Sequence, residues 1–202
     1  MAGRRSSVTP AERQERHAAV EDPAVVLEAA ARFLEARPRS VAEVRRRLGR
    51  AGYRSELVEG AIIRLGELGL LDDEAFGRAW VESRDRARPR GEIALRRELS
   101  LKGVDRAIVN ELLDERREAT AATAASDPTA DAGLGPDVPA ATRLIARNER
   151  ALGRIADPRK RRQRAYALLA RNGFDPDTCR LVSAAVTADV ADSADSADLG
   201  EA

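Results

Sequence analysis

A short motif recurs three times along this chain of 202 residues: a leucine, three further residues, a glycine, and then directly an apolar residue. The glycines are Gly52, Gly103 and Gly173, and a second apolar residue follows each of them at the sixth position. The copies are 51 and 70 residues apart, and the longer spacing contains a polar insertion. This spacing predicts a tandem array of about 50-residue units, which stack because each is too small to bury its own apolar residues.

The apolar residues between these motifs recur at helical spacing, and no stretch shows sustained alternation of apolar and polar residues. Aromatic residues make up only 3% of the chain, so the core must be built from aliphatic side chains. Helix starts are marked by Asp-Pro pairs at Asp22, Asp157 and Asp175 and by a capping box from Ser40 to Glu43. The pattern predicts nine helices, with a further charged helix from Thr9 onward. The expected fold is all-α, an elongated and curved tandem array of three three-helix repeats.

Charge and composition divide the chain into segments. The polar insertion, at residues 119–139, forms a linker with three acidic and no basic residues. The following segment, 140–182, contains 11 basic and 4 acidic residues, and the C-terminal tail after it is acidic. Neither linker nor tail has enough large apolar residues to offset the entropy of ordering. We therefore expect a polar arm at 1–22, repeats at 23–69 (repeat 1), 70–118 (repeat 2) and 140–187 (repeat 3), a flexible linker at 119–139 and an acidic disordered tail at 188–202.

Several classes of function are disfavoured by residue counts alone. Cys179 is the only cysteine and His17 the only histidine, which excludes an internal disulfide and a Cys/His zinc module. A nucleophile–histidine catalytic system would require His17 to fold back from a polar terminal segment. Neither a GxxxxGK[ST] loop nor a GxGxxG motif occurs. We expect a cytoplasmic, monomeric protein that is not an enzyme, with no cofactor, no metal site and no membrane segment.

The most distinctive stretch runs from Gly69 to Arg84. Its adjacent acids, Asp72, Asp73 and Glu74, are interpreted as a helix cap, because they follow a glycine and precede an apolar helix. A metal or acid/base cluster is the alternative. Phe76 and Trp80, four residues apart, are interpreted as core anchors that join repeats 1 and 2. Stacking of Trp80 on a nucleobase is the alternative.

Arginine accounts for 33 of the 35 basic residues, although the formal net charge is only +1. Most of these side chains are expected on solvated helix faces. The helix that begins at Asp157-Pro158 differs, because it has five cations near its start, where the helix dipole disfavours them. The Arg-Pro-Arg-Gly stretch at 88–91 repeats this placement. An external anion explains both.

The stretch GLLDDEAFGRAWVESR and the segment Glu98–Gly103 resemble the bacterial RecX regulatory proteins. The resemblance covers about residues 24–187 and is most specific between Arg37 and Leu113. It implies an all-helical tandem of three-helix repeats that binds the RecA recombinase filament in its groove and modulates strand exchange and ATP turnover, usually by inhibition. Repeat 3 departs from the family pattern through its long linker and the polar Asn148. The positions that match the family motifs are Asp72, Asp73, Phe76, Trp80, Val81, Arg84, Leu99, Lys102 and Gly103.

The resemblance and the arginine pattern together imply roles for three groups of residues. Contact with the RecA filament is assigned to Arg84, Arg88, Arg90, Arg96, Arg97 and Lys102. Contact with the phosphates of single- or double-stranded DNA is assigned to Arg45, Arg46, Arg159, Lys160, Arg161 and Arg162. A structural role is assigned to Asp72, Asp73, Phe76, Trp80 and Gly103. The competing hypothesis is a free-standing nucleic-acid-binding regulator that uses pairs of helices as helix-turn-helix motifs; an acid/base enzyme that uses Asp72 and Asp73 is a third.

Overall fold

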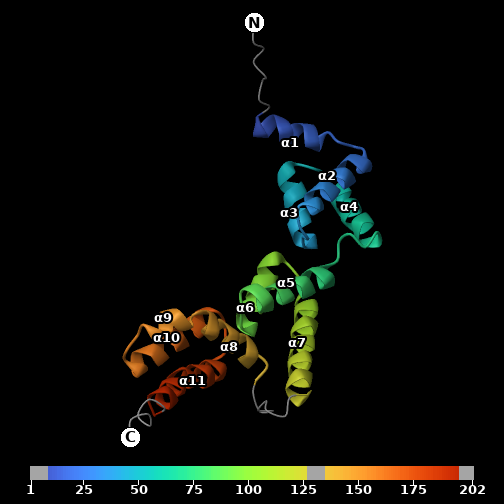
Figure 1. Ribbon diagram of the computed structural model, residues 1–202. Helices are drawn as coiled ribbons and strands as arrows, with labels where there is room; N and C mark the ends of the chain where they lie inside the picture. Colours follow the sequence, from blue (N-terminus) through green and yellow to red (C-terminus); the bar gives the residue numbers. More distant parts are fainter. Residues whose placement is uncertain (1–8, 127–134, 196–202) are drawn as a thin grey trace. The chain divides into compact units, whose positions relative to one another are not determined.

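The computed structural model describes residues 9–126 and 135–195, and all regular structure in those residues is helical (Figure 1). Repeat 1 contains α2 to α4, repeat 2 contains α5 to α7, and repeat 3 contains α8 to α11. The helices are α1 (Pro10–Ala18), α2 (Pro23–Glu35), α3 (Val41–Ala51), α4 (Ser55–Glu67), α5 (Asp73–Ala87), α6 (Glu92–Lys102), α7 (Arg106–Ser126), α8 (Val138–Arg147), α9 (Glu149–Gly153), α10 (Pro158–Arg171) and α11 (Pro176–Asp195).

The expected helix starts are confirmed. The Asp22 carboxylate accepts the Ala24 N–H at the start of α2, and Asp157 accepts two backbone N–H groups at the start of α10. Ser40 and Glu43 form the expected capping box of α3. The charged helix expected from Thr9 is α1, which Thr9 opens with a second capping box. Each cap satisfies N–H groups that have no partner within the helix, so local sequence alone places these starts.

The recurring glycines also lie where the motif places them, at the end of a helix: Gly52 and Gly103 directly follow α3 and α6, and Gly173 lies two residues after the end of α10. Gly52, Gly103 and Gly173 have φ values of 98°, 81° and 79°, in the left-handed region that disfavours side chains. We call the end of the preceding helix together with its glycine a corner. The corners are corner 1 (α3 and Gly52), corner 2 (α6 and Gly103) and corner 3 (α10 and Gly173).

The chain divides into two compact units. Unit 1 contains residues 1–77 and 100–108, and its core lies between α2, α3 and α4. Val26, Ala30, Val44 and Leu48 are almost fully buried there, and Leu65 of α4 closes the same cluster. Helix α1 packs on α3. Apolar residues at helical spacing therefore build this core as the periodicity predicts.

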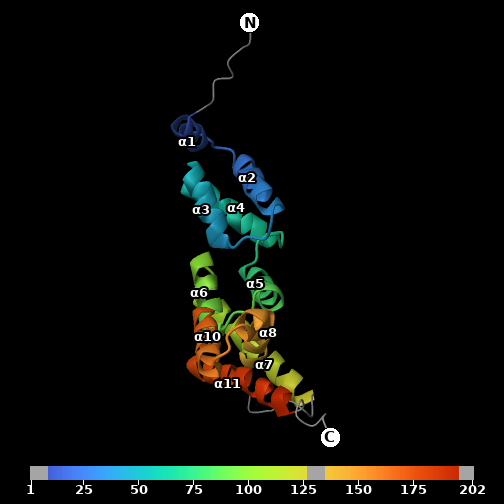
Figure 2. The ribbon, with the colours of Figure 1, turned by 60° about the vertical axis from the view of Figure 1, so that its left-hand side comes forward.

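Unit 2 contains residues 78–99 and 109–202. In this unit α10 packs against α11, and the two lie side by side in Figures 1 and 2, with α8 packed against both. Ala141, Leu169, Phe174 and Cys179 form this part of the core. In repeat 2, the buried residues include Leu95, Leu99, Val109, Leu112 and Leu113.

The structure corrects two expectations about the less regular segments and confirms a third. Helix α7 continues to Ser126, so residues 119–126 are helical rather than linker, because this stretch is rich in alanine, the best helix former. The first helix of repeat 3 is interrupted at Asn148, as expected, and is divided there into α8 and α9; the Asn148 side-chain amide donates to the Leu144 carbonyl at 2.8 Å. Helix α11 extends to Asp195, into the expected tail. Residues 127–134 and 196–202 lie outside the described residues.

Candidate partner-binding surface

The α5–α6 segment of repeat 2 carries a cluster of polar side chains around Glu98. The Glu98 Oε2 atom accepts the indole N–H of Trp80 at 2.9 Å and the Nε–H of Arg84 at 2.6 Å. The Arg90 Nε atom lies 3.4 Å from Glu98 Oε1, and a second Arg90 nitrogen donates to the Asn172 side chain. Two guanidinium groups thus share one carboxylate, which leaves the cluster with a net charge of +1.

Trp80 differs from the core anchor that the sequence suggested. Its side chain is half-buried, because the indole N–H takes a carboxylate partner instead of entering the apolar core. The Arg84 guanidinium lies 4.4 Å from the centroid of the Trp80 ring, a cation–π contact. This face of the ring is therefore occupied within the chain and is not open to a nucleobase. Phe76, in contrast, is buried.

The five arginines and one lysine assigned to filament contact fall into two sets. Arg84, Arg90, Arg96 and Lys102 are paired with acidic side chains: Arg84 and Arg90 with Glu98, Arg96 with Glu92, and Lys102 with Glu43. Arg88 and Arg97 are exposed, and neither forms an ion pair within the part of the chain that the structure describes. The exposed pair can therefore meet an external carboxylate without first breaking an internal one.

The residues assigned to phosphate contact are also divided by the structure. Arg45 forms a two-pronged ion pair with Glu59, at 2.6 and 2.7 Å, and Arg46 donates to the Lys102 carbonyl at 3.4 Å. Arg161 is only 7% exposed, and both its Nε and Nη2 atoms donate to the Ile155 carbonyl at 3.0 Å. Arg161 is thus a structural residue of the α9–α10 connection, because its side chain lies on the buried side of α10 while its neighbours are exposed. The prediction of a phosphate contact at Arg161 is corrected accordingly.

A groove lies beside the remaining cations of α10. Arg159, Lys160 and Arg162 are exposed, and two of them border a hollow of about 310 Å³ between α10 and α11. Its lining is formed by Arg159, Arg162, Gln163, Tyr166, Arg180 and Ser183. Arg180 is paired with Asp177, whereas Arg159 and Arg162 have no ion pair among the described residues. The groove therefore combines an aromatic side chain with two uncompensated guanidinium groups.

The acids of the distinctive stretch have structural partners. The Asp72 Oδ1 atom accepts the N–H groups of Glu74 at 2.8 Å and Ala75 at 3.1 Å, as the cap interpretation predicts. Asp73 accepts the N–H of Val41, at the start of α3, at 2.9 Å. Burial raises the pKa of the Asp73 carboxyl, and the neighbouring Asp72 charge acts in the same direction. Among the described residues, no group of three or more His, Cys, Asp and Glu side chains could hold a metal ion.

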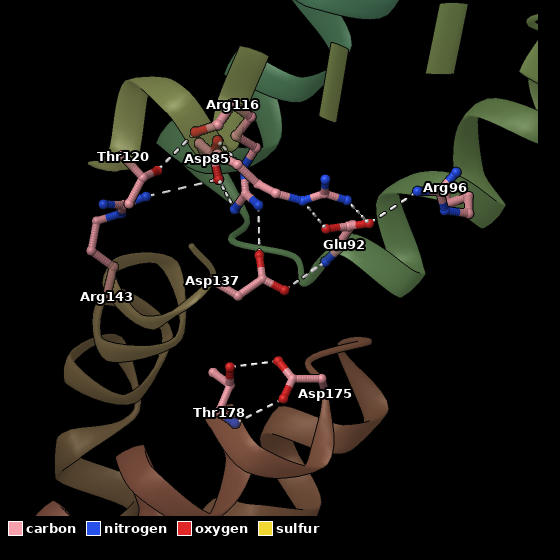
Figure 3. Close-up of polar contacts among 10 residues, drawn as sticks. Asp85, Glu92, Arg96, Arg116, Thr120, Asp137, Arg143, Asp175 and Thr178 are labelled. Atoms are coloured by element: carbon pink, nitrogen blue, oxygen red, sulfur yellow. Dashed lines mark hydrogen bonds and ion pairs between the residues drawn. The ribbon is translucent and has the colours of Figure 1, made fainter. Parts of the chain in front are cut away.

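An ionic network in unit 2 was not predicted from the sequence (Figure 3). Arg116 of α7 is 10% exposed at its side chain and pairs with Asp85 of α5 at 2.9 Å and with Asp137 at 2.5 Å. Asp137 directly precedes α8, and its second oxygen accepts the Glu92 N–H at the start of α6, at 2.8 Å. Burial raises the pKa of the Asp137 carboxyl. One carboxylate thus joins the start of repeat 3 to two helices of repeat 2.

The sequence held only a weak signal for this network. An aspartate two residues before Pro139 marks a helix start, and the structure confirms α8 there. The Asp137 side chain, however, caps α6 rather than its own helix, for which it makes no cap bond. Nothing within a few residues of Asp137 indicates Arg116 as its partner, because the two side chains meet only in the folded chain.

No described helix is both long enough and apolar enough to cross a membrane.

Comparison with known proteins agrees with the three-helix repeats of the fold. Residues 27–65 match the model of "RecX, first three-helix domain", and residues 72–113 match that of "RecX, second three-helix domain". The Regulatory protein RecX of Mycobacterium avium is 30% identical over 78% of this chain and 83% of its own length. That of Pelodictyon phaeoclathratiforme is 41% identical over 86 residues, which span 43% of this chain and 54% of the relative.

A solved structure is also similar. The crystal structure of RecX from Lactobacillus salivarius superposes with a TM-score of 0.64 over 82% of this chain and 97% of that chain, at 17% sequence identity, which indicates a shared fold. Three-helix repeats in tandem define this chain as a helical-repeat protein. The matched domains and the sequence relatives show that the chain belongs to the RecX family of regulatory proteins.

Proposed function

We propose that this chain is a non-enzymatic regulator that acts in the cytoplasm as a monomer. It binds the RecA recombinase filament on DNA and inhibits strand exchange and ATP hydrolysis. The membership in the RecX family supports this proposal. The observation that carries it is that the segment matched by the second RecX domain holds Arg88 and Arg97 exposed beside the Glu98 cluster.

In the proposed contact, the arginines that are ion-paired within the chain and the exposed arginines have different roles. Arg84, Arg90 and Arg96 are fixed by Glu98 and Glu92, so they keep the α5–α6 surface in one arrangement before the partner arrives. Preorganisation of this kind lowers the entropy that binding must overcome. The exposed guanidinium groups then form forked hydrogen bonds with carboxylates of RecA.

The test is a charge reversal at the exposed arginines. In the variant Arg88→Glu/Arg97→Glu, we expect the concentration needed for half-inhibition of RecA strand exchange to rise by about tenfold or more, even at low salt. The matched control is Arg150→Glu/Arg154→Glu, which changes the charge equally at two exposed arginines of repeat 3. Circular dichroism confirms that both variants are folded. Full inhibition by the first variant would contradict the proposal.

A second contact, with DNA phosphate, is favoured by the α10–α11 groove. Arg159 and Arg162 border it without internal partners, and Tyr166 offers a ring on which a base could stack. Replacing both arginines by serine should flatten the log–log salt dependence of DNA affinity by about 1.8 for a duplex, or about 1.4 for a single strand. Inhibition of RecA should persist in part.

The same measurement distinguishes a RecA regulator from the alternative, a free-standing nucleic-acid-binding regulator. Such a protein should bind naked DNA as tightly as it binds the RecA filament, and the serine variant should lose all activity. A RecA regulator should gain affinity from the filament and retain it after the substitution. An unchanged salt dependence would exclude the groove as a phosphate contact.

A further inference from the structure

Corners 2 and 3 each hold the start of a helix from the preceding repeat through a hydrogen bond to an equivalent carbonyl. The carbonyl directly before each corner glycine accepts a donor that directly precedes a helix of the neighbouring repeat. At corner 2, the Lys102 carbonyl accepts the Ser40 hydroxyl at 2.6 Å, just before α3. At corner 3, the Asn172 carbonyl accepts the Gly91 N–H at 3.1 Å, just before α6. A carbonyl that the helix leaves without a partner is thus satisfied by the adjacent repeat.

The two corners also share a steric feature. A methyl group on Gly103 would overlap the Cβ atom of Ala42, in the first turn of α3. A methyl group on Gly173 would overlap the Cβ atom of Ala94, in the first turn of α6. Each corner therefore accepts the first turn of a helix that has an alanine at its second or third residue. The glycine gives close approach, and the carbonyl requires a donor.

Among the described residues, α1 contacts corner 1, as the start of α3 contacts corner 2 and the start of α6 contacts corner 3. The Ala51 carbonyl, directly before Gly52, lies 2.6 Å from His17 Nδ1, which donates the hydrogen bond because a carbonyl can only accept. The Arg50 carbonyl accepts the Gln14 side-chain amide at 3.3 Å. A methyl group on Gly52 would lie 2.9 Å from the Gln14 backbone oxygen. Helix α1 thus supplies both the donor and the close contact.

The attachment of α1 is lighter than that of the repeats. No residue of α1 is buried, whereas Ser40 at corner 2 is fully buried and Gly91 at corner 3 is buried as well. In addition to the hydrogen bonds of Gln14 and His17, α1 stacks His17 on Tyr53, with ring centroids 4.3 Å apart. A short connection joins α1 to α2 and holds it near its corner at a high effective concentration.

We propose that α1 is a detachable cover and that corner 1, when uncovered, is a docking surface for a helix of a partner protein. The partner helix has a small side chain at its second or third residue and a hydroxyl or backbone N–H donor directly before its first residue. These are the properties of the segments that corners 2 and 3 already hold. The proposal does not depend on the RecA assignment.

The test uses the full chain with α1 loosened by the substitutions Gln14→Ala/His17→Ala. The matched control is Glu15→Ala/Arg16→Ala, which alters two exposed residues of the same helix. The probe is a labelled synthetic peptide of residues 38–51, which begins with the Ser40 turn and contains Ala42. A second peptide with Ala42→Leu tests the steric requirement.

We expect the peptide to bind the loosened chain about tenfold more tightly than the wild type or the control, because α1 no longer competes for the corner. The amide NMR signals of Gly52 and Tyr53 should shift on binding, and the Ala42→Leu peptide should not bind. Equal binding to the loosened chain and the control, no binding to either, or equal binding of both peptides would overturn the proposal.

Discussion

Gly91 lies against Gly173 so closely that a methyl group on Gly91 would overlap the Gly173 carbonyl oxygen. The Gly91 N–H donates to the Asn172 carbonyl at 3.1 Å, and the Asn172 side chain is bonded in turn to Arg90. The two glycines are 82 residues apart in the sequence. Their contact fixes the start of α6 on corner 3 and so joins repeats 2 and 3 within unit 2.

The substitution Gly91→Ala should therefore destabilise the fold by about 2 kcal/mol, because the added methyl group must displace backbone atoms. Gly153→Ala is the control: Gly153 ends α9 with nothing near its Cβ position, and alanine is the better helix former. Urea unfolding of both variants measures the difference. Equal free energies of unfolding for the two variants would contradict the close packing of Gly91 against Gly173.

The substitution Arg116→Met should reduce the free energy of unfolding by about 3 kcal/mol at pH 7. It leaves Asp137, which is only 4% exposed, as a buried carboxylate without its cation. In contrast, Arg32→Met removes an exposed ion pair with Glu28 and should cost less than about 1 kcal/mol. Denaturant titration distinguishes them; equal losses would contradict the structural role of the network.

The cost of Arg116→Met should also depend on pH. Burial raises the folded-state pKa of Asp137, so the stability linked to its protonated form is complete below the unfolded pKa and is lost as the pH rises through the folded pKa. Loss of Arg116 raises the folded pKa further and widens this window. The gap between variant and wild type should shrink when unfolding is measured at pH 5 instead of pH 7. A constant gap would show that the charge of Asp137 is not responsible.

Glu43 should show the opposite dependence. Burial acts to raise its pKa, but hydrogen bonds from Lys102 and Arg37 prevail and hold it below the ordinary value of 4.5. A lowered pKa gives stability that is present above the unfolded pKa and is lost as the pH falls through the folded pKa. Glu43→Gln should cost about 1 kcal/mol at pH 7 and less at pH 3. Thermal melts at both pH values test this; an equal cost would contradict it.

Asp72→Ala should cost about 1 kcal/mol through the loss of the α5 cap, whereas Asp72→Asn should cost little, because asparagine also accepts these hydrogen bonds. Thermal melting measures both. An unchanged melting temperature together with lost inhibition of RecA would instead identify Asp72 as a functional carboxylate.

The sequence by itself determined where helices begin and end. Ser40, Asp157 and the corner glycines act on backbone groups within about four residues, so their effects do not depend on the rest of the chain. Helical periodicity identified the core in the same way, since the apolar face of a helix is defined by residue spacing. The same local reasoning failed at residues 119–126, where low hydrophobicity suggested a linker but alanine favours helix.

Only the tertiary structure decided what each charged residue does. Arg159, Arg161 and Arg162 lie on one turn of α10, yet Arg161 is buried on a backbone carbonyl while its neighbours border a groove. Asp73 and Asp137 bind groups 32 and 45 residues away. The physical reason is that a charge is stabilised by its burial and its partner, and both are set by residues that become neighbours only when the helices pack.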